Sequence, residues 1–258
     1  MRGDGKGNNV FAHAAALAKR FKAHIVVTHC RPRPEDLLPF GVPIPAFMKD
    51  QVMAQAREVA DQEEQGLERE FAELAGKFNL KIADGPDHKA ASASWIEEAG
   101  RQVDVIKHHG RLADVICVAK PDVDRNLGTN TLKAALFNTG RPVMMCPNAK
   151  TAPETIGASI SIAWNGSTEA ARAVALTMGI IEKADEIVIL SCGTQIHGAN
   201  AEDLLAYLSD RGIAANVHRF TAKKKIGAEL LERSKANGAD LMIMGAYGDS
   251  HERETVWS

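Results

Sequence analysis

The sequence predicts an α/β protein made of two tandem doubly wound parallel-sheet units. The first observation is length, because 258 residues are enough for two ordinary domains. The second is an alternation of amphipathic helical patterns with short apolar runs, which is typical of strands buried on both faces of a parallel sheet. The third is that this alternation occurs twice along the chain, which indicates two copies of one unit.

Two pairs of segments carry the repeat. HAAALAKRFKAHIVVTHC, ending at Cys30, matches RAVALTMGIIEKADEIVILSC, ending at Cys192, and in both an alanine-rich helix precedes a β-branched run. LADVICVAKPD, from Leu112, matches GADLMIMGAYGD, from Gly238, and in both Ala-Asp leads into four apolar residues and a loop. We therefore expect a first unit at 1–147, a polar linker at 148–155 and a second unit at 156–258.

The expected elements follow chain order. In the first unit we expect helices at 9–21, 46–78, 90–102 and 129–138 and strands at 24–30, 80–83, 113–119 and 142–146. In the second unit we expect strands at 159–164, 186–192, 215–220 and 241–244 and helices at 169–183, 200–211 and 224–237.

Composition excludes several classes of protein. Lysine and arginine number 31 against 33 acidic residues, so the net charge of −2 lacks the basic excess of a nucleic-acid binder. No apolar stretch reaches the ~20 residues that cross a bilayer, and the polar N-terminus has no signal-peptide core. The four cysteines form no C-x-x-C pair and lie in or beside apolar runs, which fits free thiols in the cytoplasm.

The glycines after the last apolar run resemble a phosphate loop. Gly245 and Gly248 are spaced G-x-x-G directly after the run that ends at Met244. Backbone N–H groups bind a phosphate only at close approach, which a side chain would block, and such turns often need positive φ. The alternative is that both glycines only shape a tight turn.

At this point the sequence resembles the universal stress protein family in its tandem form. The resemblance is carried by the repeated α/β units, by AWNGSTEAARAV starting at Ala163, and by GAYG starting at Gly245. It implies a sheet of order 3-2-1-4-5 in each unit (an adenine nucleotide alpha hydrolase-like fold) and a role in stress response. Many members of the family bind ATP, with Mg, through a G-x2-G-x9-G-[ST] loop, whereas others lack the glycines and do not bind it. The resemblance also implies self-association or pairing of the two units through the fifth strand.

The family's nucleotide motif is only partly present. Gly245 and Gly248 match its first two glycines, whereas Ser258 stands where the third is expected. Asn165 stands where the family has an acid after the first strand. The candidate nucleotide-binding residues are Ala163, Trp164, Asn165, Gly166, Ser167, Gly245, Ala246, Gly248 and Ser258.

The first unit departs further from the motif. Ala119 and Asp122 occupy the positions of the two glycines, and a carboxylate there would repel phosphate. We therefore expect a degenerate site. Each unit is also expected to be incomplete at one chain end: the first lacks its first strand, and the second lacks its last helix and strand.

Other candidates have simpler explanations. His108 and His109 resemble a metal pair, but adjacent residues diverge on a helix or strand, so an exposed loop is expected and no metal ligand is assigned. Trp164 can stack on a base or fill the core. Ser167 can bind phosphate or cap the following helix, and capping is favoured.

Three functions remain open. The leading one is a stress-response module that senses or carries an adenine nucleotide. The second is a nucleotide-free interaction scaffold of the same fold. The third is an ATP-using hydrolase or nucleotidyl transferase, although the sequence offers no general base or metal carboxylates, so no catalytic residue is assigned.

Overall fold

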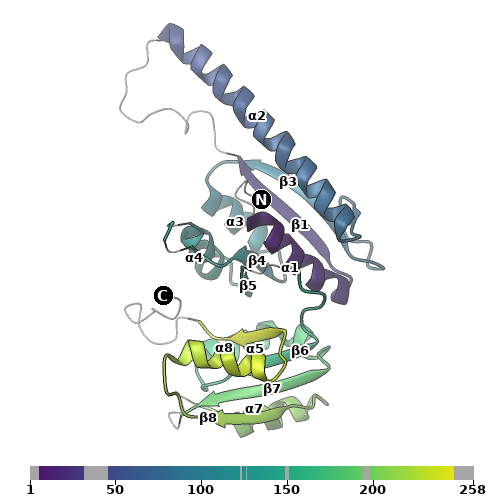
Figure 1. Ribbon diagram of the computed structural model, residues 1–258, viewed down its shortest axis with the longest axis vertical. Coiled ribbons are helices and arrows are strands. Elements are labelled where there is room, and N and C mark those ends of the chain that lie inside the picture. The colour runs from purple at the N-terminus through teal and green to yellow at the C-terminus, as the bar shows by residue number, and fades with distance from the viewer. Residues whose placement is uncertain are drawn as a thin grey trace. The chain divides into compact units, whose positions relative to one another are not determined.

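The computed structural model describes residues 6–31, 46–122, 124–125, 127–148, 151–193 and 198–246. Two of the candidate site residues, Gly248 and Ser258, lie outside them. The chain divides into two compact units, Met1–Pro153 and Glu154–Ser258 (Figure 1). Within the described residues, no helix is both long and apolar enough to span a membrane.

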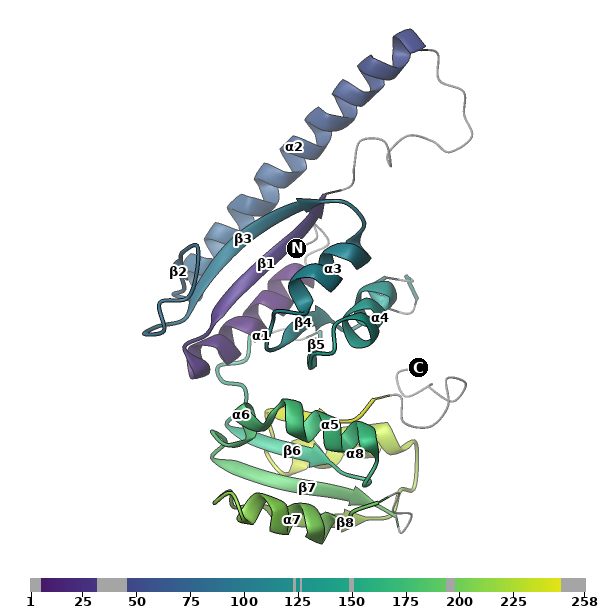
Figure 2. The ribbon, with the colours of Figure 1, turned by 180° about the vertical axis from the view of Figure 1, so that it is seen from behind.

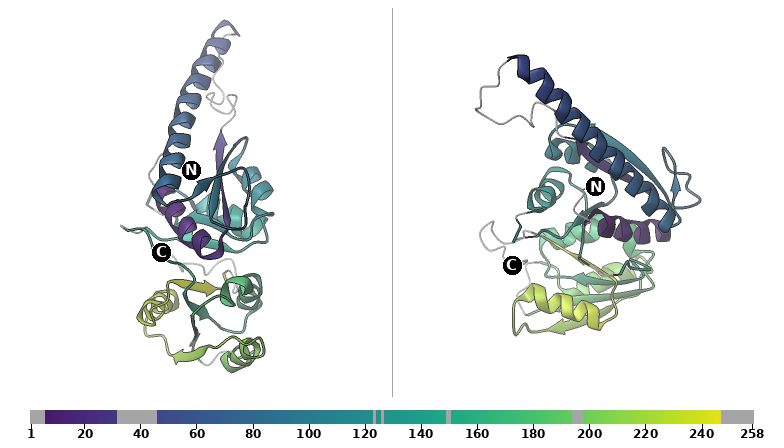
Figure 3. Two further views of the ribbon diagram at one scale, coloured as in Figure 1. Left: turned by 90° about the vertical axis from the view of Figure 1, so that its right-hand side faces the viewer. Right: turned by 45° about the horizontal axis from the view of Figure 1, so that its top comes forward.

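The second unit alternates strands with helices. Its elements are β6 (Ser159–Ala163), α5 (Thr168–Leu176), α6 (Met178–Ile181), β7 (Glu186–Cys192), α7 (Ala201–Ser209), β8 (Asn216–Phe220), α8 (Ile226–Ala236) and β9 (Leu241–Met244). The four strands form one parallel sheet in the order β8-β7-β6-β9. Helices α5 and α7 cover one face of this sheet and α8 covers the other, as the left view of Figure 3 shows. The unit is therefore doubly wound, as predicted.

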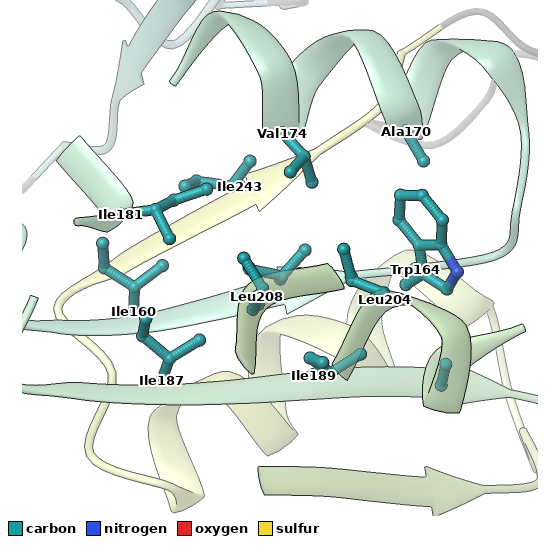
Figure 4. Packing of buried hydrophobic residues seen from close by; sticks show 12 residues of the cluster. Ile160, Trp164, Ala170, Val174, Ile181, Ile187, Ile189, Leu204, Leu208 and Ile243 are labelled. Carbon is teal, nitrogen blue, oxygen red and sulfur yellow. The ribbon is translucent and has the colours of Figure 1, made fainter. Parts of the chain in front are cut away.

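Strand β6 is buried on both faces of the sheet, and its side chains alternate between them. Ile160 and Ile162 point to the same face and are at most 1% exposed. They belong to the apolar cluster between the sheet and the helices α5 and α7 (Figure 4). Between them Ser161 points to the opposite face, where its hydroxyl lies 2.7 Å from the hydroxyl of Ser234 in α8. A buried strand can carry this serine because the hydrogen bond offsets its desolvation.

The first unit contains a longer series of elements. They are α1 (Lys6–Phe21), β1 (His24–Arg31), α2 (Ala46–Lys77), β2 (Lys81–Ile82), β3 (Ser92–Ala99), α3 (Gln102–Gly110), β4 (Ile116–Ala119), α4 (Thr129–Asn138) and β5 (Val143–Cys146). Their strands form two parallel sheets, β1-β3-β2 and β4-β5. Thus in the described part of this unit β1 and β4 are not paired, whereas the corresponding β7 and β9 both pair with β6.

Helices α1 and α2 share one face of the sheet formed by β1 and β3. Phe11 of α1 and Phe71 of α2 meet edge to face, with ring centroids 6.0 Å apart, over the buried Val27 and Ala93. The long helix α2 runs beside β3 (Figure 2). Helix α4 packs against β4 and β5, with Leu132 in the buried cluster, and α3 packs against α4 and β1.

The predicted helix at 90–102 is wrong, because most of this segment is strand β3. Its alanines and glutamates favour a helix locally, but eight residues pair in register with β1. The hydroxyls of Ser92 and Ser94 also lie 2.8 and 2.9 Å from the two ring nitrogens of His24 in β1. These contacts are distant in sequence, so tertiary structure overrides local propensity.

The loop position predicted for His108 and His109 is also wrong. Both residues lie in the last turn of α3. Their rings stack, with centroids 4.7 Å apart, instead of diverging.

Candidate functional site

The strand order of the second unit fixes where a ligand would bind. From β6 the chain passes through α5 to β7 on one side, and it later returns through α8 to β9 on the other side. The carboxyl ends of β6 and β9 therefore flank the point at which the winding reverses. In open α/β sheets, ligands bind in the crevice outside the carboxyl ends of the strands at this point.

The turn after β6 leads directly into helix α5. Ala163 ends the strand, and the side-chain carbonyl of Asn165 accepts a hydrogen bond from the backbone N–H of Ser167 over 3.1 Å. The Ser167 hydroxyl accepts from the N–H of Ala170 over 3.2 Å, which confirms its predicted role as the cap of α5. The N-terminus of α5 therefore lies at the carboxyl edge of the sheet. One of its backbone N–H groups, that of Ala170, is already hydrogen-bonded to the cap.

Gly166 allows this turn to approach the loop after β7. Its φ of +75° lies in the left-handed region. A Cβ built on Gly166 would lie only 2.6 Å from the carbonyl oxygen of Ala199 and 3.0 Å from the N of Gly198. Only glycine therefore fits at this position, where two stretches of main chain are nearly in contact.

Trp164 lies in the core rather than on an open surface. It is 7% exposed and packs in the cluster with Ala170 and Leu204 (Figure 4). Its indole N–H donates to the carbonyls of Ala199, at 2.9 Å, and Asn200, at 3.0 Å. The core position considered for this residue is thereby confirmed.

The chain after β9 also lies against the start of α5. A Cβ on Gly245 would lie 2.6 Å from the N of Ala170 and 2.8 Å from the carbonyl carbon of Glu169. The next residue, Ala246, is exposed. The two segments predicted from sequence, 163–167 and 245–246, are thus brought together around the first turn of α5.

Glu169 is a charged group at this edge that the sequence analysis did not include. Its own backbone N–H and then the Thr168 hydroxyl hold the pKa of its carboxyl below its ordinary value. A carboxylate here is favoured by the free amides and the dipole of the helix N-terminus. An acid in the first helical turn is a recognisable sequence signal, so this residue was open to prediction.

The corresponding loop of the first unit has a different structure. The backbone of Asp122 bridges to Leu127, and the Asp122 carboxylate accepts from the N–H of Arg125 over 3.2 Å. Gly128, with φ of +86°, follows and precedes α4. In the sequence alignment Asp122 corresponds to Gly248, which lies outside the described residues, so the degenerate site expected in the first unit stays a prediction.

Comparison with solved structures gives a match over nearly the whole chain. A universal stress protein from Archaeoglobus fulgidus aligns with 98% of this chain and 87% of its own, with a TM-score of 0.66 and 16% sequence identity. A universal stress protein family member from Burkholderia pseudomallei aligns with 36% of this chain and 85% of its own, with a TM-score of 0.29 and 18% identity. The first match shows that this chain has the α/β fold of that universal stress protein over nearly its whole length.

Comparisons of sequence give no match. No protein-family model matches the chain, and no curated protein matches it either.

Proposed function

We propose that this protein is a stress-response module whose second unit binds an adenine nucleotide, as ATP with Mg, at the carboxyl edge of β6 and β9. The likeness to the Archaeoglobus fulgidus universal stress protein supports the stress-response role. The nucleotide is proposed from the backbone geometry around the start of α5. The module would sense or carry the nucleotide without transforming it.

One observation carries the nucleotide proposal. Two glycines, Gly166 and Gly245, bring main chain from two loops against neighbouring backbone where a side chain would clash, and both lie beside the start of α5. These close contacts hold both loops at the N-terminus of α5, where a phosphate can approach backbone N–H groups closely enough for its oxygens to accept from them. The N-terminus of a helix adds further free amides and a favourable dipole.

One residue of the site opposes a phosphate. The Glu169 carboxylate interacts with its own amide in the first turn of α5, where it would repel an anionic ligand. Nucleotide binding therefore requires this side chain to turn outward, which it can do because it is only half-buried. Asn165 fits the ribose, since its amide can hydrogen-bond a hydroxyl without adding charge.

Thermal melts with and without Mg-ATP test the proposal. A ligand at about 100 times its dissociation constant stabilises the folded state by about 2.7 kcal/mol, which raises the melting temperature by several degrees. Asn165→Ala should reduce the shift. Glu169→Gln should increase affinity about fivefold, because removing a nearby like charge is worth about 1 kcal/mol near water.

Glu182→Gln is the matched control for the charge change. Glu182 is exposed at the end of α6, in the same unit, so its neutralisation should leave the nucleotide shift unchanged. The absence of any shift at millimolar Mg-ATP in all of these proteins would contradict nucleotide binding.

The second candidate is a nucleotide-free interaction scaffold. It is favoured by the buried, doubly hydrogen-bonded Trp164, whose ring is not open to stacking by a base. In this case the exposed edges of the sheets would serve self-association. Sedimentation at several protein concentrations, combined with the melts, separates the two functions.

The cytoplasm is the proposed location. All four cysteines are free thiols. Such thiols persist in a reducing compartment.

A further inference from the structure

A separate group of polar side chains lies in the first unit, where β3 ends and α3 ends. Glu98 is the penultimate residue of β3, and His108 and His109 lie in the last turn of α3. The His109 Nε2 atom is 2.5 Å from one carboxylate oxygen of Glu98, and the His108 Nδ1 atom is 3.5 Å from the other. One carboxylate therefore faces two imidazoles, each through its own oxygen.

The positions of the ligand atoms suit a metal ion. One ligand atom from each of the three residues can be chosen so that all lie within 4.8 Å of one another, a property of no other group in the described part of the chain. A tetrahedral Zn²⁺ with bonds of about 2.0–2.1 Å holds its ligand atoms roughly 3.3 Å apart. Side-chain movements on the order of 1 Å thus convert the present side-chain contacts into coordination bonds.

We propose that Glu98, His108 and His109 form a binding site for a divalent transition-metal ion, with Zn²⁺ as the best-fitting ion. Two imidazoles and one carboxylate are a ligand set found in zinc sites with three protein ligands, in which the fourth position is held by water. Imidazole nitrogens select zinc and its neighbours over Mg²⁺ and Ca²⁺, which prefer oxygen ligands.

Two further features favour a cation here. The histidines lie at the carboxyl end of α3, where the helix dipole is negative. The side chains of Glu98, His108 and His109 are 35%, 66% and 27% exposed, so an ion can enter from solvent without opening the fold.

Cys30 lies near the site but has another partner. It pairs in register with Glu98, on the same face of the sheet, and its thiol donates to the carbonyl of Gly100 over 3.0 Å. The ligand set is therefore the three residues named above.

Titration of the full chain with Zn²⁺ alone, followed by calorimetry, tests the site. Glu98→Gln should weaken the binding event at least tenfold, because a neutral amide replaces the charged ligand. Glu97→Gln is the matched control: Glu97 is the preceding residue of β3, and it points to the opposite face, where it pairs with Arg31 at 3.2 Å. This control should bind Zn²⁺ like the wild type.

A second measurement uses the visible spectrum of bound Co²⁺, which reports the coordination geometry and not the binding affinity. Co²⁺ bound by the wild-type protein should give the strong visible bands of a tetrahedral site, and His109→Ala should remove them. Circular dichroism of each variant establishes that it is folded. The proposal is overturned if Zn²⁺ gives no saturable binding at millimolar concentration, or if folded Glu98→Gln and His109→Ala variants bind it as tightly as Glu97→Gln.

Discussion

The indole N–H of Trp164 donates to the carbonyl of Ala199 across 2.9 Å, which ties the end of β6 to the loop that precedes α7. The same N–H reaches the carbonyl of Asn200 at 3.0 Å. Asn200 in turn caps α7, in a reciprocal arrangement with Asp203. A single buried side chain thus links the candidate site to the next crossover of the second unit.

Trp164→Phe should destabilise the second unit by about 0.5–1.5 kcal/mol, because the partly buried hydrogen bonds of the indole N–H are lost while most of the ring packing remains. Urea unfolding followed by circular dichroism measures the change. A loss below ~0.5 kcal/mol, the range of an ordinary surface substitution, would show that the two hydrogen bonds contribute little.

Gly166→Ala and Gly212→Ala form a matched pair. Both glycines have φ of +75°, but a Cβ on Gly166 meets the Ala199 oxygen at 2.6 Å, whereas a Cβ on Gly212 meets nothing within 4 Å. Each alanine costs roughly 1–2 kcal/mol for the left-handed backbone. Gly166→Ala should lower the free energy of unfolding more than Gly212→Ala does. Equal free energies of unfolding for the two variants would contradict the close approach of Gly166 to Ala199.

The buried hydroxyl pair of Ser161 and Ser234 should show strong coupling. Either serine replaced alone by alanine leaves the other hydroxyl buried without its partner, 2.7 Å away, at a cost of about 1–3 kcal/mol. Replacing both removes the two polar groups together and should cost less than the sum of the single changes. A double-mutant cycle in urea measures the difference, and additive values would contradict the pairing.

Glu229 should make the stability of the second unit depend on pH. The backbone N–H of Lys223, at 2.7 Å, and then the charge of Arg233 hold the pKa of the Glu229 carboxyl below its ordinary value of 4.5. Because the folded state prefers the carboxylate, this stabilisation is present above pH 4.5 and is lost as pH falls through the lower pKa of the folded state.

The corresponding measurement compares the wild type with Glu229→Gln. The wild type should be the more stable protein at neutral pH, and the difference between the two free energies of unfolding should shrink as the solution is acidified below pH 4.5. A difference that stays constant down to strong acid would show that Glu229 is not held as the carboxylate.

Much of the second unit was predictable because its signals are local. The apolar runs that became β7 and β9 have the predicted bounds, since β-branched or apolar residues end at a polar or glycine-containing turn on either side. Ser167 before Thr168 and Glu169 was sufficient to predict the cap of α5.

The errors concern contacts between segments distant in sequence. Strand β3 was predicted as a helix because no local sequence pattern within Ser92–Ala99 indicates its pairing with β1. Glu98 was not associated with His108 and His109 for the same reason. If residues 90–102 formed a helix, the Glu98 carboxylate would not be expected to lie near the two imidazoles. Contacts such as that of Gly166 with Ala199 likewise depend on how separate loops meet.

Backbone NMR of the full chain, titrated with Mg-ATP, tests the central claim most directly. We expect saturable shifts in the amide signals of residues 165–170 and 245–246, while those of the first unit stay in place. Saturable shifts confined to other residues, or none at millimolar Mg-ATP, would contradict a nucleotide site at the carboxyl edge of β6 and β9.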